Sequence, residues 1–154
     1  MSDLRQLIFA PKVVALIGAS NDPKKLSARP FQFCQQHKFS GKLYLVNPHH
    51  HEVLGQLAFS SVLTIPDKVD HAYILLRTKL VEAALDDCIA AGVKVVSILA
   101  DGFAEAGDEG MALQTRLVAK AKSADVTLIG PNSMGVVNVD NGFMCTTNAA
   151  FKAE

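Results

Sequence analysis

The clearest chemical signal in the sequence is a turn of small residues directly after its first apolar run. Residues 13–17 are apolar, and Gly18, Ala19, Ser20 and Asn21 follow at once. Small residues after a buried strand let backbone amides approach a phosphate closely, and a serine hydroxyl adds a hydrogen bond. A tight exit from a strand would use the same glycine. The turn therefore predicts a phosphate-binding loop, with a purely structural turn as the alternative.

Three cationic residues follow this turn within one short segment. Lys24, Lys25 and Arg29 lie at the entrance of an expected helix, where positive charge opposes the helix dipole and a bound anion would offset it. A solvated surface patch is the alternative. Together with Gly18 and Ser20, the cluster favours a ligand that carries more than one phosphate group.

The turn departs from the two common nucleotide-binding signatures. It reads Gly-Ala-Ser-Asn-Asp-Pro, with one glycine, whereas the dinucleotide fingerprint G-x-G-x-x-G needs three. After the second expected strand, Asn47 and Pro48 stand where such a domain would have an acidic residue for the ribose. The P-loop pattern G-x-x-x-x-G-K-S/T is also absent from the sequence. An NAD(P)-binding oxidoreductase domain is therefore a disfavoured alternative.

No catalytic or metal-binding residue is expected on this chain. Its histidines are His37, His49, His50, His51 and His71, and none lies in a glycine-rich turn before a helix. The side chains of the three consecutive histidines diverge, and no further cysteine or histidine follows at ligand spacing. We interpret this run as a solvated loop.

Five short apolar runs predict the strands that position these residues. Nearly continuous apolar runs rich in β-branched residues are typical of strands buried on both faces of a parallel sheet. They span residues 12–18, 42–48, 71–76, 93–100 and 126–130. The segment 52–69, between two of these runs, is expected to be mostly irregular.

Helical spacing lies between the expected strands. Leu80 opens an apolar stripe that is expected to end before Gly92, a residue typical of helix C-termini. A second stripe covers residues 113–121. In the first connection, Ser27 is expected to cap a helix that tolerates Pro30 in its first turn.

This alternation of strand and helix predicts the α/β fold class, with an open parallel sheet and right-handed crossovers. In such a sheet, ligands bind outside the carboxyl ends of the strands, near the point where strand order reverses. Gly18 ends the first, central strand, which places the phosphate loop at that point. The 154 residues suit one domain, and the last residues show no clear stop, so we expect the N-terminal part of a longer multidomain protein.

Composition argues against several classes of partner. Fifteen basic residues balance fifteen acidic ones, so no net field draws the chain to nucleic acid or to an anionic membrane. No apolar stretch approaches the roughly 20 residues of a membrane-spanning helix, and the start of the chain lacks the layout of a signal peptide. We therefore expect a cytoplasmic protein with no nucleic-acid or membrane partner.

Several motifs, taken in order, resemble a known family. The sequence contains FAPKVVALIGASNDPKKLS, GKLYLVNP followed by EVLGQLAFSSV, then DGFAEAGDEG and IGPNSMGVVN. This order is similar to the CoA-binding domain of NDP-forming acyl-CoA synthetases. These enzymes are relatives of the succinyl-CoA synthetase α subunit and of bacterial protein lysine acetyltransferases that carry the same module. The resemblance covers the chain from about residue 7 to residue 151.

The resemblance implies a Rossmann-like, doubly wound, mainly parallel sheet of about five strands in a three-layer αβα arrangement. Coenzyme A or acyl-CoA would bind along its carboxyl edge. The loop at Gly18–Asn21 would cradle the nucleotide phosphates, and the Lys25 region would lie near the 3′-phosphoadenosine. The turn at Asn47 and Pro48 would close on the adenosine.

Two further segments would border the pantetheine arm of CoA. The residue types suit this role, because Gly102 and Gly107 let backbone donors face the cleft, while Asn132 can fix a sharp turn by bonding neighbouring backbone. A plain loop would look similar. Cys145 would lie near the cleft edge, where it could form a mixed disulfide with CoA. The expected contacts of the two segments are Ala100, Asp101, Gly102, Glu105, Pro131 and Asn132.

The same resemblance assigns the catalytic steps to parts outside this chain. Acyl-CoA synthesis in the family passes through a phosphohistidine in a second domain, and an ATP-grasp domain handles the nucleotide. We therefore expect the CoA-binding domain of an ADP-forming acyl-CoA synthetase or related acetyltransferase, not catalytic alone, with such domains or a subunit as partners. The alternative is a stand-alone CoA-binding regulatory module. A homo-oligomer is left open.

Overall fold

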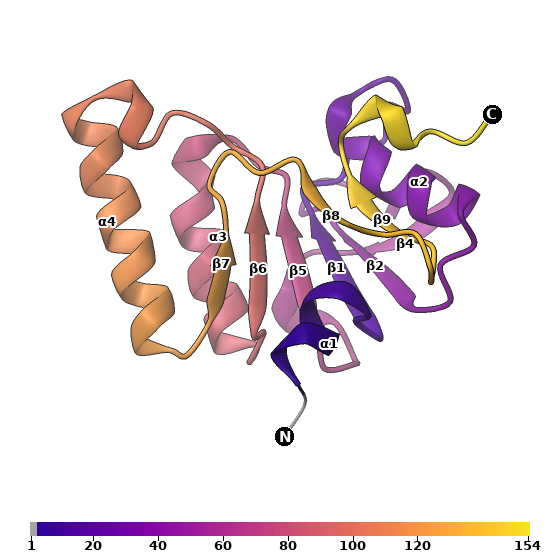
Figure 1. Cartoon of the computed structure of the whole chain (residues 1–154), viewed down its shortest axis with the longest axis horizontal. Coiled ribbons are helices and arrows are strands. Elements are labelled where there is room, and N and C mark those ends of the chain that lie inside the picture. Colours follow the sequence, from indigo (N-terminus) through magenta and orange to yellow (C-terminus); the bar gives the residue numbers. More distant parts are fainter. Residues whose placement is uncertain (1–2) are drawn as a thin grey trace.

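A seven-stranded sheet runs through the middle of the molecule (Figure 1). The computed structural model describes residues 3–154. Strand order is β3-β4-β2-β1-β5-β6-β7, and only the β3–β4 pair is antiparallel. All five expected strands are confirmed, as β1 (Val13–Ile17), β2 (Lys42–Val46), β5 (His71–Ile74), β6 (Val95–Ile98) and β7 (Thr127–Ile129).

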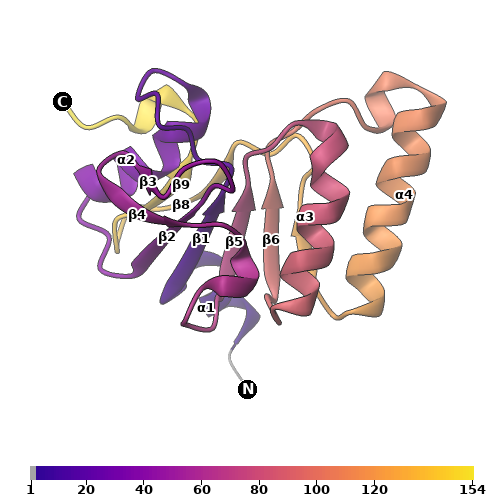
Figure 2. The same cartoon turned by 180° about the vertical axis from the view of Figure 1, so that it is seen from behind.

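The sheet has two strands more than expected, and both lie in the segment expected to be mostly irregular. They are β3 (Glu52–Val53) and β4 (Gln56–Phe59), which form a hairpin that pairs with β2 through β4 (Figure 2). Each buries one side chain, Val53 in β3 and Ala58 in β4, and Leu57 of β4 faces solvent. Because neither strand is buried on both faces, neither has the continuous apolar run that identified the other five.

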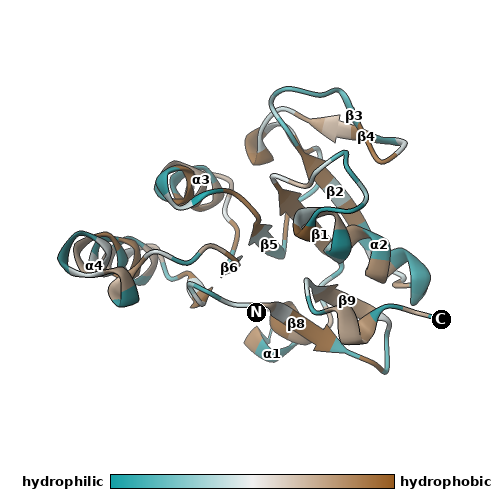
Figure 3. Ribbon diagram, turned by 90° about the horizontal axis from the view of Figure 1, so that it is seen from above, coloured by the Kyte–Doolittle hydropathy of each residue, from teal (hydrophilic) through white to brown (hydrophobic). Residues whose placement is uncertain are grey.

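Helices cover both faces of the sheet (Figure 3). On one face lie α3 (Thr78–Ala90) and α4 (Asp108–Ser123), whose Val81, Leu85 and Leu117 join one hydrophobic core. On the other lies α2 (Arg29–Gln36), whose Phe31 and Cys34 join a second core. The expected three-layer, doubly wound α/β class is therefore confirmed.

The second face also carries elements that the sequence pattern did not indicate. A separate antiparallel hairpin of β8 (Gly135–Asn138) and β9 (Phe143–Thr146) packs beside α2. The short helix α1 (Leu4–Phe9) contacts β8. This outer layer is thus half helix and half hairpin, because α2 alone is too short to cover the sheet. Single turns of 3-10 helix complete the chain, as η1 (Leu26–Ala28), η2 (Val62–Thr64), η3 (Ala104–Ala106) and η4 (Ala149–Phe151).

Strand order reverses between β1 and β5. The connection from β1 to β2 crosses one face through α2, whereas those from β5 to β6 and from β6 to β7 cross the other through α3 and α4. The backbone N–H of Leu75, just after β5, donates to the Ile17 carbonyl at 2.7 Å. The two carboxyl ends therefore stay side by side, and their loops part to opposite faces there.

Helix ends follow local sequence signals in one case and depart from them in another. Helix α3 ends at Ala90 and is followed by Gly92 with φ +77°, and the N–H groups of Gly92 and Val93 bond back to Ile89 and Cys88. Ser27 was expected to cap the first helix, but it lies within η1, and α2 begins at Arg29 without a side-chain cap. The 3-10 turn that precedes α2 replaces the cap.

Ion pairs connect α3 to α4 on their solvent-exposed surfaces. Arg116 Nη2 lies 3.1 Å from Glu82 Oε2, and Lys120 Nζ lies 3.1 Å from Glu82 Oε1 and 2.9 Å from Asp86 Oδ1. The hydrogen bonds from Arg116 and then Lys120 lower the pKa of Glu82 from its ordinary 4.5 to about 2. Within residues 3–154, no helix is long and apolar enough to cross a membrane.

Glu82→Gln is expected to lower stability at pH 7, because it removes the carboxylate that pairs with Arg116 and Lys120. Because the folded pKa lies below the ordinary value, the contribution of Glu82 is fully present above pH 4.5 and is lost as pH falls toward about 2. Urea midpoints measured from pH 7 to pH 2 should converge for native and variant protein. Glu52→Gln, at an exposed position without an ion pair in the described chain, should show no such convergence.

Leu85→Ala is expected to destabilise the fold by about 2–5 kcal/mol, because it leaves a cavity between α3 and the sheet. Leu57→Ala removes the same atoms from a side chain that is 70% exposed, and its effect should stay within about 0.5 kcal/mol. The free energies of unfolding of both variants are measured by urea denaturation, with the same dependence on urea concentration as the native chain. Equal losses would mean that α3 does not dock as described.

Candidate functional site

The turn after β1 passes close to the end of β5. Gly18 has φ +92°, and its N–H donates to the Val46 carbonyl at 2.9 Å. A Cβ at this position would lie 2.5 Å from Leu76 Cδ2 and 3.2 Å from the carbonyl carbon of Leu75. The backbone conformation and the crowding both favour glycine here. The turn can therefore run against the neighbouring strand end.

The loop that follows is built from short-range hydrogen bonds. Ser20 Oγ accepts from the N–H of Asp22 at 3.0 Å, and Asp22 Oδ1 accepts from the N–H of Lys24 at 3.0 Å. The Ser20 hydroxyl accepts in this bond, so its proton remains available to a ligand. The side chains of Lys24 and Lys25 are exposed. These bonds fix the backbone that carries the two cations.

Two asparagines hold this loop against its neighbours. Asn21 Oδ1 accepts from the N–H of Leu54 in the β3–β4 turn at 2.8 Å. Asn47 Nδ2 donates to the Ala19 carbonyl at 3.4 Å, and Asn47 Oδ1 accepts from the N–H of His49 at 2.9 Å. The structure thus brings residues 18–21 and the turn after β2 together. Both amide side chains already serve as structural links there.

Arg29, unlike the two lysines, is bonded to a distant segment of the chain. Its Nη1 donates to the Thr147 carbonyl at 2.8 Å, just beyond β9, and its side chain is half-buried. The three cations that are close in sequence therefore have different surroundings. Lys24 and Lys25 face solvent, whereas Arg29 joins the start of α2 to the hairpin layer.

The loops after β6 and β7 form a second group at the same sheet edge. The N–H of Asn132 donates to the Ala100 carbonyl at 2.8 Å, and Pro131 precedes it. Asn132 has φ +55°, but its side chain makes none of the turn bonds expected of it. Ser133 takes that part, since its Oγ accepts from the N–H of Gly135 at 3.1 Å.

Glu105 uses backbone donors that were expected to face the cleft. The N–H of Gly102 donates to Glu105 Oε1 at 2.6 Å. Hydrogen bonds from the backbone of Glu105, Gly102 and Phe103 lower the pKa of this carboxyl group. Thr78 Oγ1 donates to the Asp101 carbonyl at 2.7 Å and ties the same loop to the start of α3. This loop therefore satisfies its own polar groups.

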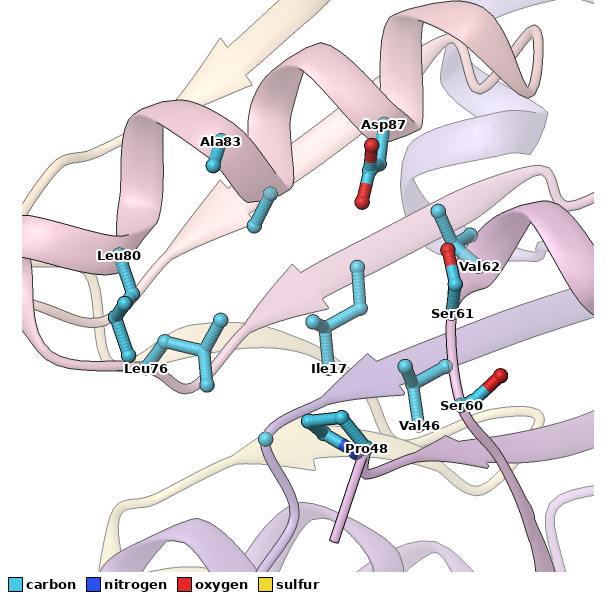
Figure 4. Close-up of a pocket in the computed structure, with 12 residues that line it drawn as sticks. Ile17, Val46, Pro48, Ser60, Ser61, Val62, Leu76, Leu80, Ala83 and Asp87 are labelled. Carbon is cyan, nitrogen blue, oxygen red and sulfur yellow. The ribbon is translucent and has the colours of Figure 1, made fainter.

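A cavity of about 280 Å³ opens between the carboxyl ends of β1 and β2 and helix α3 (Figure 4). Of the residues predicted from sequence, only Gly18 and Pro48 line it. Polar groups at its wall come from Ser60, Ser61 and Asp87. Its apolar wall is formed by Ile17, Val46, Val62, Leu76, Leu80 and Ala84.

The spacing of residues in α3 indicates the wall of the cavity that this helix forms. Leu80, Ala83, Ala84 and Asp87 line the cavity from α3 and are spaced i, i+3, i+4 and i+7, which places them on one helix face. Leu80 was expected in the buried stripe, but 41% of it is exposed, toward this cavity. An acidic residue that ends an apolar stripe is a sign of a face only partly covered by the core.

Cys145 was expected near the cleft edge, where it could form a mixed disulfide with CoA, and its burial contradicts the mixed disulfide. It lies in β9 with 1% of its surface exposed, and burial raises the pKa of its thiol well above the ordinary value. A buried thiol of this kind is inert toward a cleft ligand. Cys34 is buried in α2 and Cys88 is buried in α3. No group of three or more potential metal ligands occurs within residues 3–154.

Comparison with known proteins identifies relatives over nearly the whole chain. A family model described as a CoA binding domain matches residues 12–139. Acetate–CoA ligase (ADP-forming) II of Archaeoglobus fulgidus is 39% identical over 142 residues, which cover 92% of this chain and 21% of that protein. The alpha subunit of acetate–CoA ligase (ADP-forming) II of Pyrococcus furiosus is 42% identical over 130 residues, which cover 84% and 28%.

A solved structure gives the same result. The dinucleotide-forming acetyl-coenzyme A synthetase 1 of Ca. Korarchaeum cryptofilum, in complex with phosphate and ADP, matches with a TM-score of 0.87 at 33% identity. The match covers 96% of this chain and 31% of that chain. This chain therefore spans less than a third of the length of each of these three relatives.

Gly18→Ala is expected to destabilise the fold more than Gly107→Ala. Both positions have positive φ, and that strain costs about 1–3 kcal/mol at either one. Only Gly18 also meets Leu76 and Leu75, whereas nothing lies within 4 Å of a Cβ at Gly107. The crowding should add about 1–3 kcal/mol in urea unfolding. Similar losses in the two variants would show that the close approach at Gly18 is dispensable.

Proposed function

The chain belongs to the CoA-binding domain family, and on this premise we propose that it holds coenzyme A or acyl-CoA for an ADP-forming acyl-CoA ligase. The observation that carries the proposal is the position of Gly18. It ends the central strand at the reversal of strand order, with an apolar cavity beside it. In open α/β sheets this is where phosphate-bearing ligands bind. The full-length relatives are ligases by name, which supports a ligase over an acetyltransferase.

The phosphates of CoA are placed at residues 18–21. Gly18 lets the backbone approach a phosphate, and the Ser20 hydroxyl proton is free to donate to it. Lys24 and Lys25 carry exposed ammonium groups on the same loop, and we assign them to the 3′-phosphate. Pro48, at the cavity wall, borders the adenosine.

The pantetheine arm is assigned to the second group of loops. The backbone of Ala100 is bonded to that of Asn132, with Pro131 between the strand and this bond. Asp101 and Gly102 are held by their bonds to Thr78 and Glu105. These loops act through a rigid shape, since the polar groups named are engaged within the fold. Arg29 contributes indirectly, by fixing the start of α2.

Catalysis is assigned to further domains or subunits. The relatives are three to five times longer than this chain, which leaves room for a phosphohistidine and a nucleotide-binding domain elsewhere. His71 is fully buried against Ser97, with its Nε2 2.8 Å from Ser97 Oγ, and could not accept a phosphoryl group from solvent. The three unpaired cysteines suit a reducing compartment such as the cytoplasm.

CoA titrated calorimetrically into the purified chain should bind with a micromolar Kd. Charge reversal in the double variant Lys24→Glu, Lys25→Glu should weaken CoA binding by about tenfold or more, because two attractions become repulsions. The same variant should affect 3′-dephospho-CoA less, and NAD should not bind. Lys68→Glu, also exposed, serves as the control for a charge reversal outside this loop. An unchanged Kd in the double variant would contradict the 3′-phosphate assignment.

A stand-alone CoA-binding regulatory module remains the competing function. The size of the protein that carries this chain in cells distinguishes it from a ligase domain. An antibody against this chain should detect a product far larger than its 16.5 kDa, or co-purify a nucleotide-binding subunit, if the ligase assignment is right. A product of 16.5 kDa without such a partner would favour the regulatory module.

A further inference from the structure

The cavity beside Gly18 is suited to a flat ring. Its apolar side chains come from strand ends on one side, such as Ile17 and Val46, and from Leu80 and Ala83 of α3 on the other (Figure 4). Its volume of about 280 Å³ lies just below the range of about 300–1,000 Å³ for small-molecule sites. One ring system therefore fits it, whereas a whole CoA molecule does not.

The cavity also adjoins the proposed phosphate turn, because Gly18 belongs to both. Two parts of CoA leave its pyrophosphate, the adenosine and the pantetheine arm. Pantetheine is a flexible chain with two amide groups, and the polar partners that it needs are scarce along this apolar wall. Adenine has two apolar faces and a polar rim. The wall chemistry favours adenine.

Asp87 is the charged group at this cavity. Its carboxylate points from α3 into the space between α3 and the loop that carries Ser61 (Figure 4). The two neighbouring acidic residues of α3, Glu82 and Asp86, are paired with cations of α4. The side chain of Asp87 has no hydrogen bond or ion pair within residues 3–154. Its acceptor capacity is therefore free.

A free carboxylate beside a polyanionic ligand is unfavourable unless it meets a hydrogen-bond donor. Adenine offers one such group at its rim, the exocyclic 6-amino group, whereas a 6-oxo base presents an acceptor in the same place. Resting on the proposed function, we propose that the cavity holds the adenine ring of CoA and that Asp87 accepts a hydrogen bond from its 6-amino group. Asp87 is then a specificity-determining residue that selects adenine over 6-oxo purines.

The test compares CoA with the CoA analogue in which hypoxanthine replaces adenine, titrated into the native chain and three variants. The native chain should prefer CoA by about tenfold or more, since the analogue loses a hydrogen bond to a charged group and places two acceptors together. Asp87→Ala should bind both ligands with similar Kd. Asp87→Asn should reduce or reverse the preference, because its amide donates to a 6-oxo group.

Asp125→Asn is the control, because its fully exposed carboxylate lies at the end of α4 outside the cavity wall. It should keep the native preference. If the native chain binds both ligands equally, or if Asp87→Asn keeps the native preference, the assignment of Asp87 is wrong and CoA binding itself stands. If CoA does not bind the native chain, the proposed function fails, and the assignment of Asp87 with it.

Discussion

The close approach of β1 and β5 at their carboxyl ends is the constraint on which the rest of the site depends. Gly18 leaves β1 with φ +92° and without a side chain, and Leu76 occupies the space that a Cβ would need. Because the two strands stay paired up to this point, their loops separate abruptly to opposite faces of the sheet. The crevice and the cavity beside it are consequences of that separation.

The loops around the crevice are held largely by their own polar side chains. Asn21 and Asn47 bond to backbone across the first group of loops, and Glu105 bonds to backbone amides in the second. Arg29 reaches the carbonyl of Thr147, a residue 118 positions later in the chain. Side chains that looked like ligand contacts thus fix the loops in place. A site arranged in this way loses little entropy when a ligand binds.

Helix α3 presents three faces around its axis, and each face has different surroundings. Val81 and Leu85 pack into the sheet core, Glu82 and Asp86 pair with α4, and the face from Leu80 to Asp87 borders the cavity. These three directions follow from 3.6 residues per turn. One helix therefore supports the fold, joins its neighbour and presents a mixed apolar and acidic wall at the site.

The sequence by itself determined the five apolar strands of the parallel sheet, the α/β class and the glycine at the central strand end. Each depends on a local signal, either a continuous apolar run or a single small residue, that is readable without knowing any partner. The same local reading placed Gly18 and Pro48, the two predicted residues that line the cavity. It missed β3 and β4, because each of these strands buries a single side chain and leaves no pattern.

Only the tertiary structure decided which side chains meet. The burial of Cys145, the link from Arg29 to Thr147 and the position of Asp87 opposite Ser61 depend on the packing of segments far apart in the chain. Periodicity gives the face of a helix, but the register and crossover of the whole sheet determine what that face contacts. For this reason the position of the site at the strand ends could be predicted from local sequence, whereas the side chains that line it could not.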